Sequence, residues 1–190
     1  MKYNPDKHHC RSIRLQGYDY SQPGIYFITL CTQNRECLFG GILNGEMRLN
    51  EFGKIAHQCW LEIPQHFPHV QLDEFVVMPN HIHGIIVLNN FVVGVQNIEP
   101  LQQNIEPLQQ NIEPQPTQNA YQHIIPRSIG SIIRGFKIGV TKKFRQNTDI
   151  YVVWQRNYYE HMIRNEIELN RIRQYIIDNS KKWKTDENYI

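Results

Sequence analysis

Two histidines separated by one residue, His81 and His83, are the first side chains in the sequence that could hold a metal. They lie in HIHGIIVL, an apolar run typical of a β-strand, and side chains two residues apart on a strand leave the same face of a sheet. The two imidazoles could therefore bind one ion together, and neutral imidazole suits Mn²⁺ and other borderline metals better than it suits Mg²⁺. The alternative is a pair of half-exposed histidines at a sheet edge, because the chain holds nine histidines and such a pair arises easily.

A tyrosine and an asparagine near the end of the chain form the second candidate pair. Tyr175 and Asn179 are four residues apart in a segment with helical periodicity, so they share one face of the predicted helix with Arg171. A phenol has an unperturbed pKa of about 10, so it attacks well only with a cation beside it or beside its target. A divalent metal held by the two histidines and the Asn179 carboxamide oxygen would draw charge from a phosphate, and Arg171 could share that charge.

Two other interpretations of Tyr175 stay open. It could be a helix tyrosine that covers the sheet and keeps its hydroxyl in water. Tyr158 and Tyr159, adjacent on a predicted loop, are rival nucleophiles. We therefore expect a catalytic tyrosine, with Tyr175 as the first candidate.

The elements that must position these side chains follow from hydrophobic periodicity, capping residues and turn residues. In chain order we predict a buried strand over 24–32, a helix capped by Asn50 and ended by Pro64, strands over 70–78 and 81–88 joined through Pro79-Asn80, a helix over 129–144, a short strand over 150–154 and a last helix capped by Asn165 and running to about Asn179. The order β-α-β-β-α-β-α is that of a split βαβ, ferredoxin-like sandwich of the α+β class. We expect an antiparallel sheet with helices on one face, plus a C-terminal helix that carries Tyr175.

Basic residues are concentrated in the predicted helix over 129–144, whose apolar positions keep helical spacing. They could contact DNA phosphates, helped by the N-terminal leader, or they could simply solvate the outer face of the helix. The candidate DNA contacts are Arg11, Arg14, Arg134, Lys137, Lys142, Lys143 and Arg171.

The bulk properties limit the class of protein. A chain of 190 residues suits one domain, and a net charge of +2 means that a nucleic acid would have to be bound by a local basic surface. The four cysteines form no CxxC pair, the start lacks a signal-peptide core, and no segment offers about 18 consecutive apolar residues. We therefore expect a cytoplasmic protein with no membrane span, either a monomer or a homodimer.

A low-complexity segment interrupts this single domain. QNIEPLQ occurs twice in succession from Gln96 and is followed by QNIEPQP. A proline in every unit excludes a continuous helix, so we predict a flexible linker over 91–122.

Two motifs carry a family resemblance. MPNHIHGIIV (78–87) together with IRQYIIDN (172–179) resembles the HUH, single-tyrosine transposases of the IS200-like superfamily. The leader and first strand (11–40), the helix SIGSIIRGFKIGVTKKF (128–144) and the C-terminal region resemble the branch associated with repetitive extragenic palindromes (REPs). The resemblance covers nearly the whole chain except the repeat, and it places His81 and His83 at metal-ligand positions, Asn179 at a third, and Tyr175 at the nucleophile.

That resemblance implies a metal-dependent single-stranded DNA endonuclease and strand transferase, with Mg²⁺ or Mn²⁺ as its cofactor and no nucleotide cofactor. Its tyrosine would join a 5′-phosphate of single-stranded or hairpin DNA and release a 3′-hydroxyl. Two other functions remain open. One is a catalytically silent DNA hairpin-binding protein of the same fold, and the other is a metal-dependent hydrolase that forms no covalent intermediate.

Overall fold

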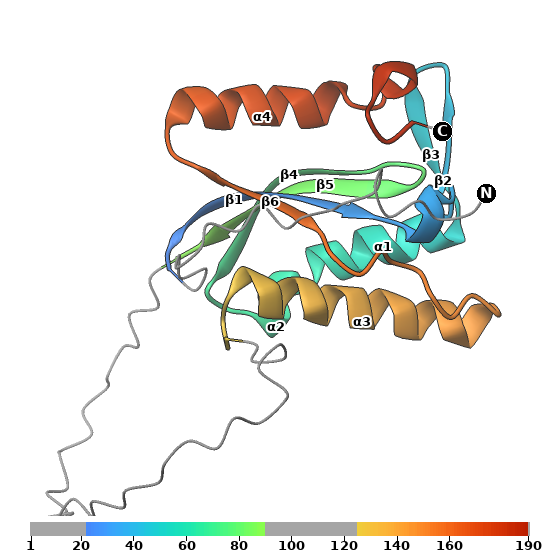
Figure 1. Ribbon diagram of the computed structural model, residues 1–190, viewed down its shortest axis with the longest axis horizontal. Helices are drawn as coiled ribbons and strands as arrows, with labels where there is room; N and C mark the ends of the chain where they lie inside the picture. Colours follow the sequence, from blue (N-terminus) through green and yellow to red (C-terminus); the bar gives the residue numbers. More distant parts are fainter. Residues whose placement is uncertain (1–21, 90–124, 190) are drawn as a thin grey trace, which may run out of the picture.

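A four-stranded antiparallel sheet forms the centre of the computed structural model, which describes residues 22–89 and 125–189 (Figure 1). The strand order is β4-β5-β1-β6, and each neighbouring pair is antiparallel. This is the order of the split βαβ, ferredoxin-like fold, so the predicted α+β class is confirmed. The strands are β1 (Gly24–Cys31), β4 (Val70–Val77), β5 (His81–Leu88) and β6 (Tyr159–Ile163).

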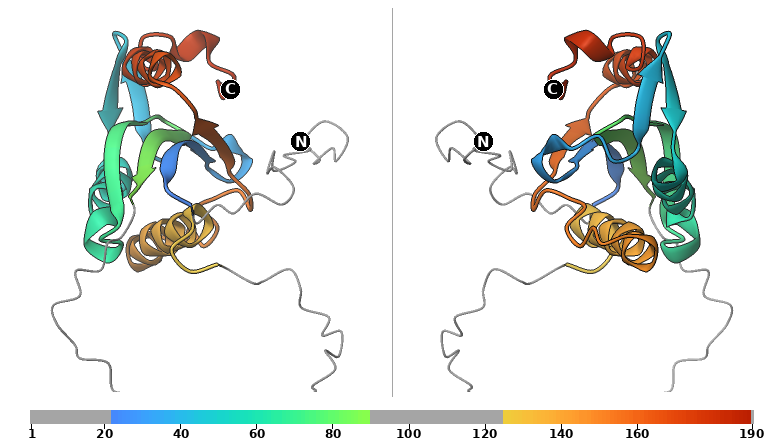
Figure 2. Two further views of the ribbon diagram at one scale, coloured as in Figure 1. Left: turned by 90° about the vertical axis from the view of Figure 1, so that its left-hand side faces the viewer. Right: turned by 90° about the vertical axis from the view of Figure 1, so that its right-hand side faces the viewer.

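Helices cover both faces of this sheet (Figures 1 and 2). On one face lie α1 (Glu51–Leu61), the short α2 (Ile63–His66) and α3 (Ile129–Asn147), while α4 (Glu166–Asp178) lies alone on the other. The predicted caps are present, since Asn50 Oδ1 accepts from the amide of Gly53 and Asn165 Oδ1 accepts from that of Glu168. Pro64, expected to end the first helix, instead lies in the first turn of α2, where its missing N–H costs nothing.

The two faces have cores of very different size. The face toward α1 and α3 carries most of the buried side chains, including Trp60 and Tyr26. A Cβ added at Gly84 would lie 2.3 Å from Trp60, so the glycine after His83 allows the helix to pack directly on β5. Within residues 22–89 and 125–189, the buried apolar cluster on the face toward α4 is much smaller and consists of Ile85, Ile163, Ile172 and Ile176.

The predicted fourth strand is wrong. Residues 150–154 are irregular apart from a single bridge between Trp154 and Thr32, and the strand that completes the sheet is β6. Val153 and Trp154 are buried in the main core, so their apolar character reflects packing and not a strand period. Tyr159, predicted on a loop, is therefore the first residue of β6.

Further elements were not predicted. A hairpin of β2 (Gly40–Leu43) and β3 (Glu46–Leu49) turns at Asn44 and Gly45, which both have positive φ, as an Asn-Gly hairpin turn requires. Two short 3₁₀ helices, η1 (Gln33–Arg35) and η3 (Trp183–Thr185), complete the described elements. The predicted linker over 91–122 lies outside the described residues. Among the described residues, no helix is long and apolar enough to cross a membrane.

Lys137, predicted as a DNA contact, connects α3 to the segment that leads into β6 through hydrogen bonds. Its Nζ donates to the backbone carbonyls of Gln155 at 2.8 Å and Asn157 at 3.0 Å, and burial lowers its pKa to about 8. Lys137→Met keeps the aliphatic stem but leaves both carbonyls without this donor. We expect the free energy of unfolding to fall by about 1–3 kcal/mol in urea denaturation, whereas Lys142→Met, at an exposed position on the same helix, should change it by less than about 0.5 kcal/mol.

Candidate active site

His81 and His83 lie on β5, an inner strand of the sheet, and their side chains point to the α4 face. They are 0% and 3% exposed, so the alternative of half-exposed histidines at a sheet edge is wrong. Their ring centroids are 4.4 Å apart. Two imidazoles are thus brought together in a buried place, where polar groups need partners.

One nitrogen of each ring is held by a neighbouring side chain. His81 Nδ1 lies 2.9 Å from Asn80 Oδ1, which only accepts, so His81 donates here. The Asn80 amide is itself fixed, because its Nδ2 donates to the carbonyls of Arg35 and Asn188. His83 Nδ1 lies 2.8 Å from the Thr29 hydroxyl. The contact with Asn80 leaves the Nε2 lone pair of His81 for another partner, and the Nε2 lone pair of His83 is left in the same way when its Nδ1–H donates to Thr29. This is the usual orientation of metal-binding histidines.

Helix α4 brings Tyr175 and Asn179 to the same place. The Tyr175 hydroxyl is 3.1 Å from His83 Nε2, and Asn179 is the C-cap residue of the helix, 1% exposed. The predicted spacing of four residues therefore places both side chains beside the histidines. Tyr175 remains 40% exposed, so a macromolecule could reach its hydroxyl from outside.

Asp186, just after η3, joins the group from the C-terminal segment. Its Oδ2 accepts from Asn179 Nδ2 at 3.0 Å and from the Tyr175 hydroxyl at 3.3 Å. Since the amide NH₂ faces the carboxylate, Asn179 Oδ1 is the amide atom left for another partner. The ligand atoms of His81, His83 and Asp186 all lie within 4.8 Å of one another.

Two buried atoms of this cluster lack a hydrogen-bond partner within residues 22–89 and 125–189. They are His81 Nε2 and Asn179 Oδ1, each a lone-pair donor to metals. A buried unpaired polar atom costs about 1–3 kcal/mol, so a cation between them would satisfy both. This residue set fits a divalent ion, with nitrogen and oxygen ligands of the kind that Mn²⁺ accepts and Mg²⁺ tolerates.

The protonation states suit such a site. Burial lowers the pKa of His81 to about 4, against the opposing pull of Asp186, and burial also holds the pKa of His83 well below its ordinary value. Both rings are neutral near pH 7 and can act as ligands. Burial, followed by the Asp186 carboxylate, raises the pKa of Tyr175 to about 12, so its phenol stays protonated until something stabilises the phenolate.

The predicted DNA contacts do not gather at this cluster. Helix α3 lies on the opposite face of the sheet, where Arg134 and Lys142 are exposed and Lys143 pairs with Glu62 at 3.5 Å. Arg171 lies on α4, where its Nη2 is 4.0 Å from Glu168. Arg11 and Arg14 lie outside the described residues.

Three residues of the cluster were missed in the sequence. Asn80 directly precedes His81 in the sequence, so a contact between their side chains could have been predicted. The position of Thr29 beside His83 depends on the register of β1 against β5, in which the two residues pair. Asp186 lies in a short polar stretch with no periodicity, and no sequence signal marks it.

Comparisons with known proteins show a close relative in sequence and a likeness in fold to solved structures. An uncharacterized protein of Haemophilus influenzae (strain ATCC 51907 / DSM 11121 / KW20 / Rd) is 48% identical over 189 residues, which covers 100% of this chain and 98% of that protein. The solved structure of a REP-associated tyrosine transposase bound to a REP hairpin has a TM-score of 0.54 and 18% identity, covering 87% of this chain and 71% of that one. A solved Deinococcus radiodurans R1 protein is less similar, with a TM-score of 0.45 and 15% identity over 88% of this chain and 96% of that one. No profile of a known protein family matches.

Proposed function

The chain belongs to one family with the Haemophilus influenzae protein and has the fold of a REP-associated tyrosine transposase, and from this premise we propose that it cuts and rejoins single-stranded DNA. The reaction would be a metal-dependent transesterification through a 5′-phosphotyrosine intermediate, on hairpins formed by palindromic repeats. The structural relative was solved bound to a REP hairpin, which supports this class of substrate.

One observation carries the proposal. The hydroxyl of a half-exposed tyrosine, Tyr175, lies 3.1 Å from a buried histidine, beside two buried lone-pair atoms that have no hydrogen-bond partner among the described residues. A helix tyrosine that only covers the sheet and keeps its hydroxyl in water would not need this surrounding set of ligands. His81, His83 and Asn179 would hold the ion, with Asp186 as a fourth group at the same site.

The atoms of the proposed step balance without any further reactant. The Tyr175 oxygen forms a bond to phosphorus, the bond from phosphorus to the 3′ oxygen breaks, and the 3′-hydroxyl leaves with the proton that the phenol gives up. Bound Mg²⁺ or Mn²⁺ would act as a Lewis acid at the scissile phosphate. Because the phosphotyrosine conserves the energy of the broken ester, a second 3′-hydroxyl can reverse the step and join another strand.

The chain's own residues have separate tasks in this step. Asp186 accepts from the phenol at 3.3 Å and His83 Nε2 lies 3.1 Å from the same hydroxyl, so the two side chains fix the position of the phenol oxygen. Asn80 and Thr29 hold the imidazole rings. The proposed phosphate contacts are Arg134, Lys142, Lys143 and Arg171, with Arg11 and Arg14 from the leader. Helix α3 and helix α4 lie on opposite faces of the sheet, so contacts to both require a DNA that reaches around the edge of the sheet.

The test is an incubation of the purified protein with a labelled single-stranded hairpin and Mn²⁺ or Mg²⁺, followed by a denaturing gel. We expect a DNA-linked protein band together with one shortened strand that ends in a free 3′-hydroxyl. Binding without any cleavage would identify a silent hairpin-binding protein. Cleavage that leaves free ends on both sides would identify a hydrolase without a covalent intermediate.

Helix α4 is positioned by an ion pair as well as by its small core. Arg173 donates from Nε to Asp73 Oδ1 at 2.8 Å and from Nη2 to Oδ2, at the irregular register of β4. Arg173→Lys keeps the charge but loses this two-point geometry. We expect the rate of adduct formation to fall by about tenfold, because Tyr175 lies two residues further along the helix, with a stability loss of at most about 1 kcal/mol.

The control for this variant is Lys54→Ala, which removes a surface ion pair with Glu51 on α1. It should change neither the rate nor the melting temperature. An unchanged rate with Arg173→Lys would mean that the apolar cluster alone positions the helix.

The hydrogen bond from Arg173 is the largest cause of the lowered pKa of Asp73. The stabilisation that this pair gives the fold is therefore fully present above pH 3.8, and it is lost as the pH falls through the folded-state pKa of Asp73.

A further inference from the structure

The proposed metal site depends on the direction in which the Asn179 carboxamide faces. Its Oδ1 can bind a cation, whereas its Nδ2 carries two hydrogens and cannot. A half turn about the last side-chain bond exchanges the two atoms without moving the rest of the side chain. A site that needs the oxygen must therefore hold the NH₂ group in a fixed place.

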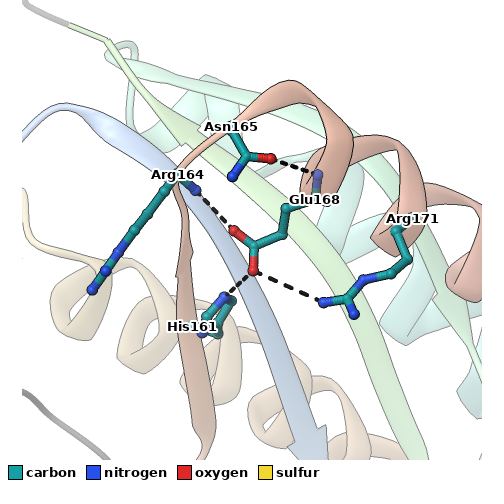
Figure 3. A network of polar contacts seen from close by, with 5 residues as sticks. All are labelled: His161, Arg164, Asn165, Glu168 and Arg171. Carbon is teal, nitrogen blue, oxygen red and sulfur yellow. Dashed lines mark hydrogen bonds and ion pairs between the residues drawn. The ribbon is translucent and has the colours of Figure 1, made fainter.

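The backbone of α4 is fixed by contacts far from this carboxamide. At the start of the helix, the Glu168 amide donates to Asn165 Oδ1 at 2.9 Å. The Glu168 carboxylate accepts from the Arg164 amide at 3.0 Å and lies 2.8 Å from His161 Nε2 (Figure 3). These contacts place the helix but do not touch Asn179, so the choice between its oxygen and its nitrogen depends on other residues.

Asp186 is the acceptor that holds the NH₂ group of Asn179. Its Oδ2 accepts from Asn179 Nδ2 at 3.0 Å, and its Oδ1 accepts from the Asn188 amide at 2.7 Å. A carboxylate only accepts, so the reverse orientation of the carboxamide would set two acceptor oxygens against each other. The orientation that Asp186 imposes leaves Asn179 Oδ1 buried and without a hydrogen-bond partner among the described residues.

Asp186 is held in turn by bonds between the C-terminal segment and the turn at η1. Arg35 Nη1 donates to the carbonyl of Glu187 at 2.8 Å, and Asn80 Nδ2 donates to that of Asn188 at 2.8 Å. The backbone of Arg35 has a φ of 57°, a strained conformation that a non-glycine residue keeps only where its surroundings enforce it. The residues on both sides of this contact are therefore fixed in place.

We propose that Asp186 is a positioning residue of the metal site, an inference that rests on the proposed function. It holds the Asn179 carboxamide with the oxygen toward the ion and is not itself a ligand. Arg35 acts one step further away, by holding the segment that carries Asp186. The competing role is direct coordination, since the ligand atoms of Asp186, His81 and His83 all lie within 4.8 Å of one another.

Asn179→Asp separates the two roles, because a carboxylate presents an oxygen whichever way it faces. Titration calorimetry with MnCl₂ measures the affinity of the full chain without DNA. Asp186→Asn alone is expected to weaken Mn²⁺ binding by about 100-fold, because the new amide can turn its own NH₂ toward Asn179. With Asn179→Asp already in place, the same substitution should cost less than about tenfold, since no orientation is left to set and a repulsion between two carboxylates is relieved.

Arg35→Ala tests the contact that holds the segment. It should weaken Mn²⁺ binding by about 3- to 10-fold, and add less than about twofold to the loss caused by Asp186→Asn, because both act through one contact. Removal of a positive charge would by itself favour a cation, so a fall in affinity isolates the positioning effect. Arg48→Ala, which removes an exposed arginine paired with Glu46, should leave the affinity unchanged.

The melting temperature of each variant without metal shows whether it folds. Arg35 is exposed, so its substitution is expected to leave the fold intact. Equal losses from Asp186→Asn with and without Asn179→Asp would overturn the proposal and identify a ligand. An unchanged affinity in Asp186→Asn would overturn it as well.

An adduct assay on the wild-type protein separates this failure from that of the proposed function. A covalent adduct together with Mn²⁺ binding that does not depend on Asp186 contradicts the positioning role alone. Mn²⁺ binding that follows the expected pattern without an adduct on any tyrosine supports the positioning role and contradicts the transesterification. Absence of Mn²⁺ binding by the wild-type protein would overturn both.

Discussion

Tyr175→Phe is expected to abolish the covalent DNA adduct while leaving hairpin binding at the wild-type level. The substitution removes one oxygen and keeps the ring, which packs edge-on against Phe27 with centroids 6.1 Å apart. The hydroxyl is the attacking atom in the proposed step, and among residues 22–89 and 125–189 it is the phenol that contacts His83, so the loss should be at least about 10³-fold. A denaturing gel of labelled DNA quantifies the adduct, and mass spectrometry of the digested complex identifies the modified peptide.

The matched controls are Tyr158→Phe and Tyr159→Phe. Tyr159 lies on the same face of the sheet as His83, with its ring centroid 6.2 Å from that of Phe27, so it is the nearest rival nucleophile. Both controls should keep the adduct. If the adduct survived Tyr175→Phe and disappeared with one of them, Tyr175 would be the wrong nucleophile, although the class of reaction would stand.

His81→Ala is expected to weaken Mn²⁺ binding by at least about 100-fold and to remove adduct formation with it. The variant deletes one of the two buried atoms of this cluster that have no hydrogen-bond partner among the described residues, so the remaining ligands can no longer enclose an ion. Asn80→Ala, which releases the His81 ring, should weaken binding by about 10- to 100-fold. Titration calorimetry with MnCl₂ measures both affinities, and EDTA should stop the wild-type reaction until Mn²⁺ is restored.

His69→Ala is the control for the loss of an imidazole. His69 lies away from the cluster, with its Nε2 3.1 Å from the carbonyl of Arg127, and its substitution should leave Mn²⁺ binding unchanged. An unchanged affinity in His81→Ala would place the ion elsewhere in the protein. Adduct formation by the wild-type protein in excess EDTA would show that the reaction needs no metal.

The sequence was most informative about side chains that lie on the same strand or the same helix. The period of two along HIHGIIVL placed both imidazoles on one face of β5, and the i, i+4 spacing placed Tyr175 above Asn179 on α4. Local capping chemistry was equally clear, since Asn50 and Asn165 both bond the amide three residues later. In these cases neighbours along the chain decide the geometry, so the residues alone suffice.

Features that depend on contacts between distant segments could not be predicted. Residues 150–154 have a strand-like composition because Val153 and Trp154 enter the core, while the real strand β6 includes a glutamate, which β-propensity disfavours. Asp186 reaches the histidines only because η3 turns the chain back over the end of α4. Lys137 looked like one more surface charge, and its carbonyl partners lie 18 and 20 residues away.

The most direct measurement is the anomalous diffraction of a crystal soaked in Mn²⁺. One strong anomalous peak is expected, within coordinating distance of His81 Nε2, His83 Nε2 and Asn179 Oδ1, with the Tyr175 hydroxyl facing the open side of the ion. A peak bound by other residues, or a Tyr175 hydroxyl directed away from the ion in its own subunit and in every neighbouring one, would contradict catalysis at this site.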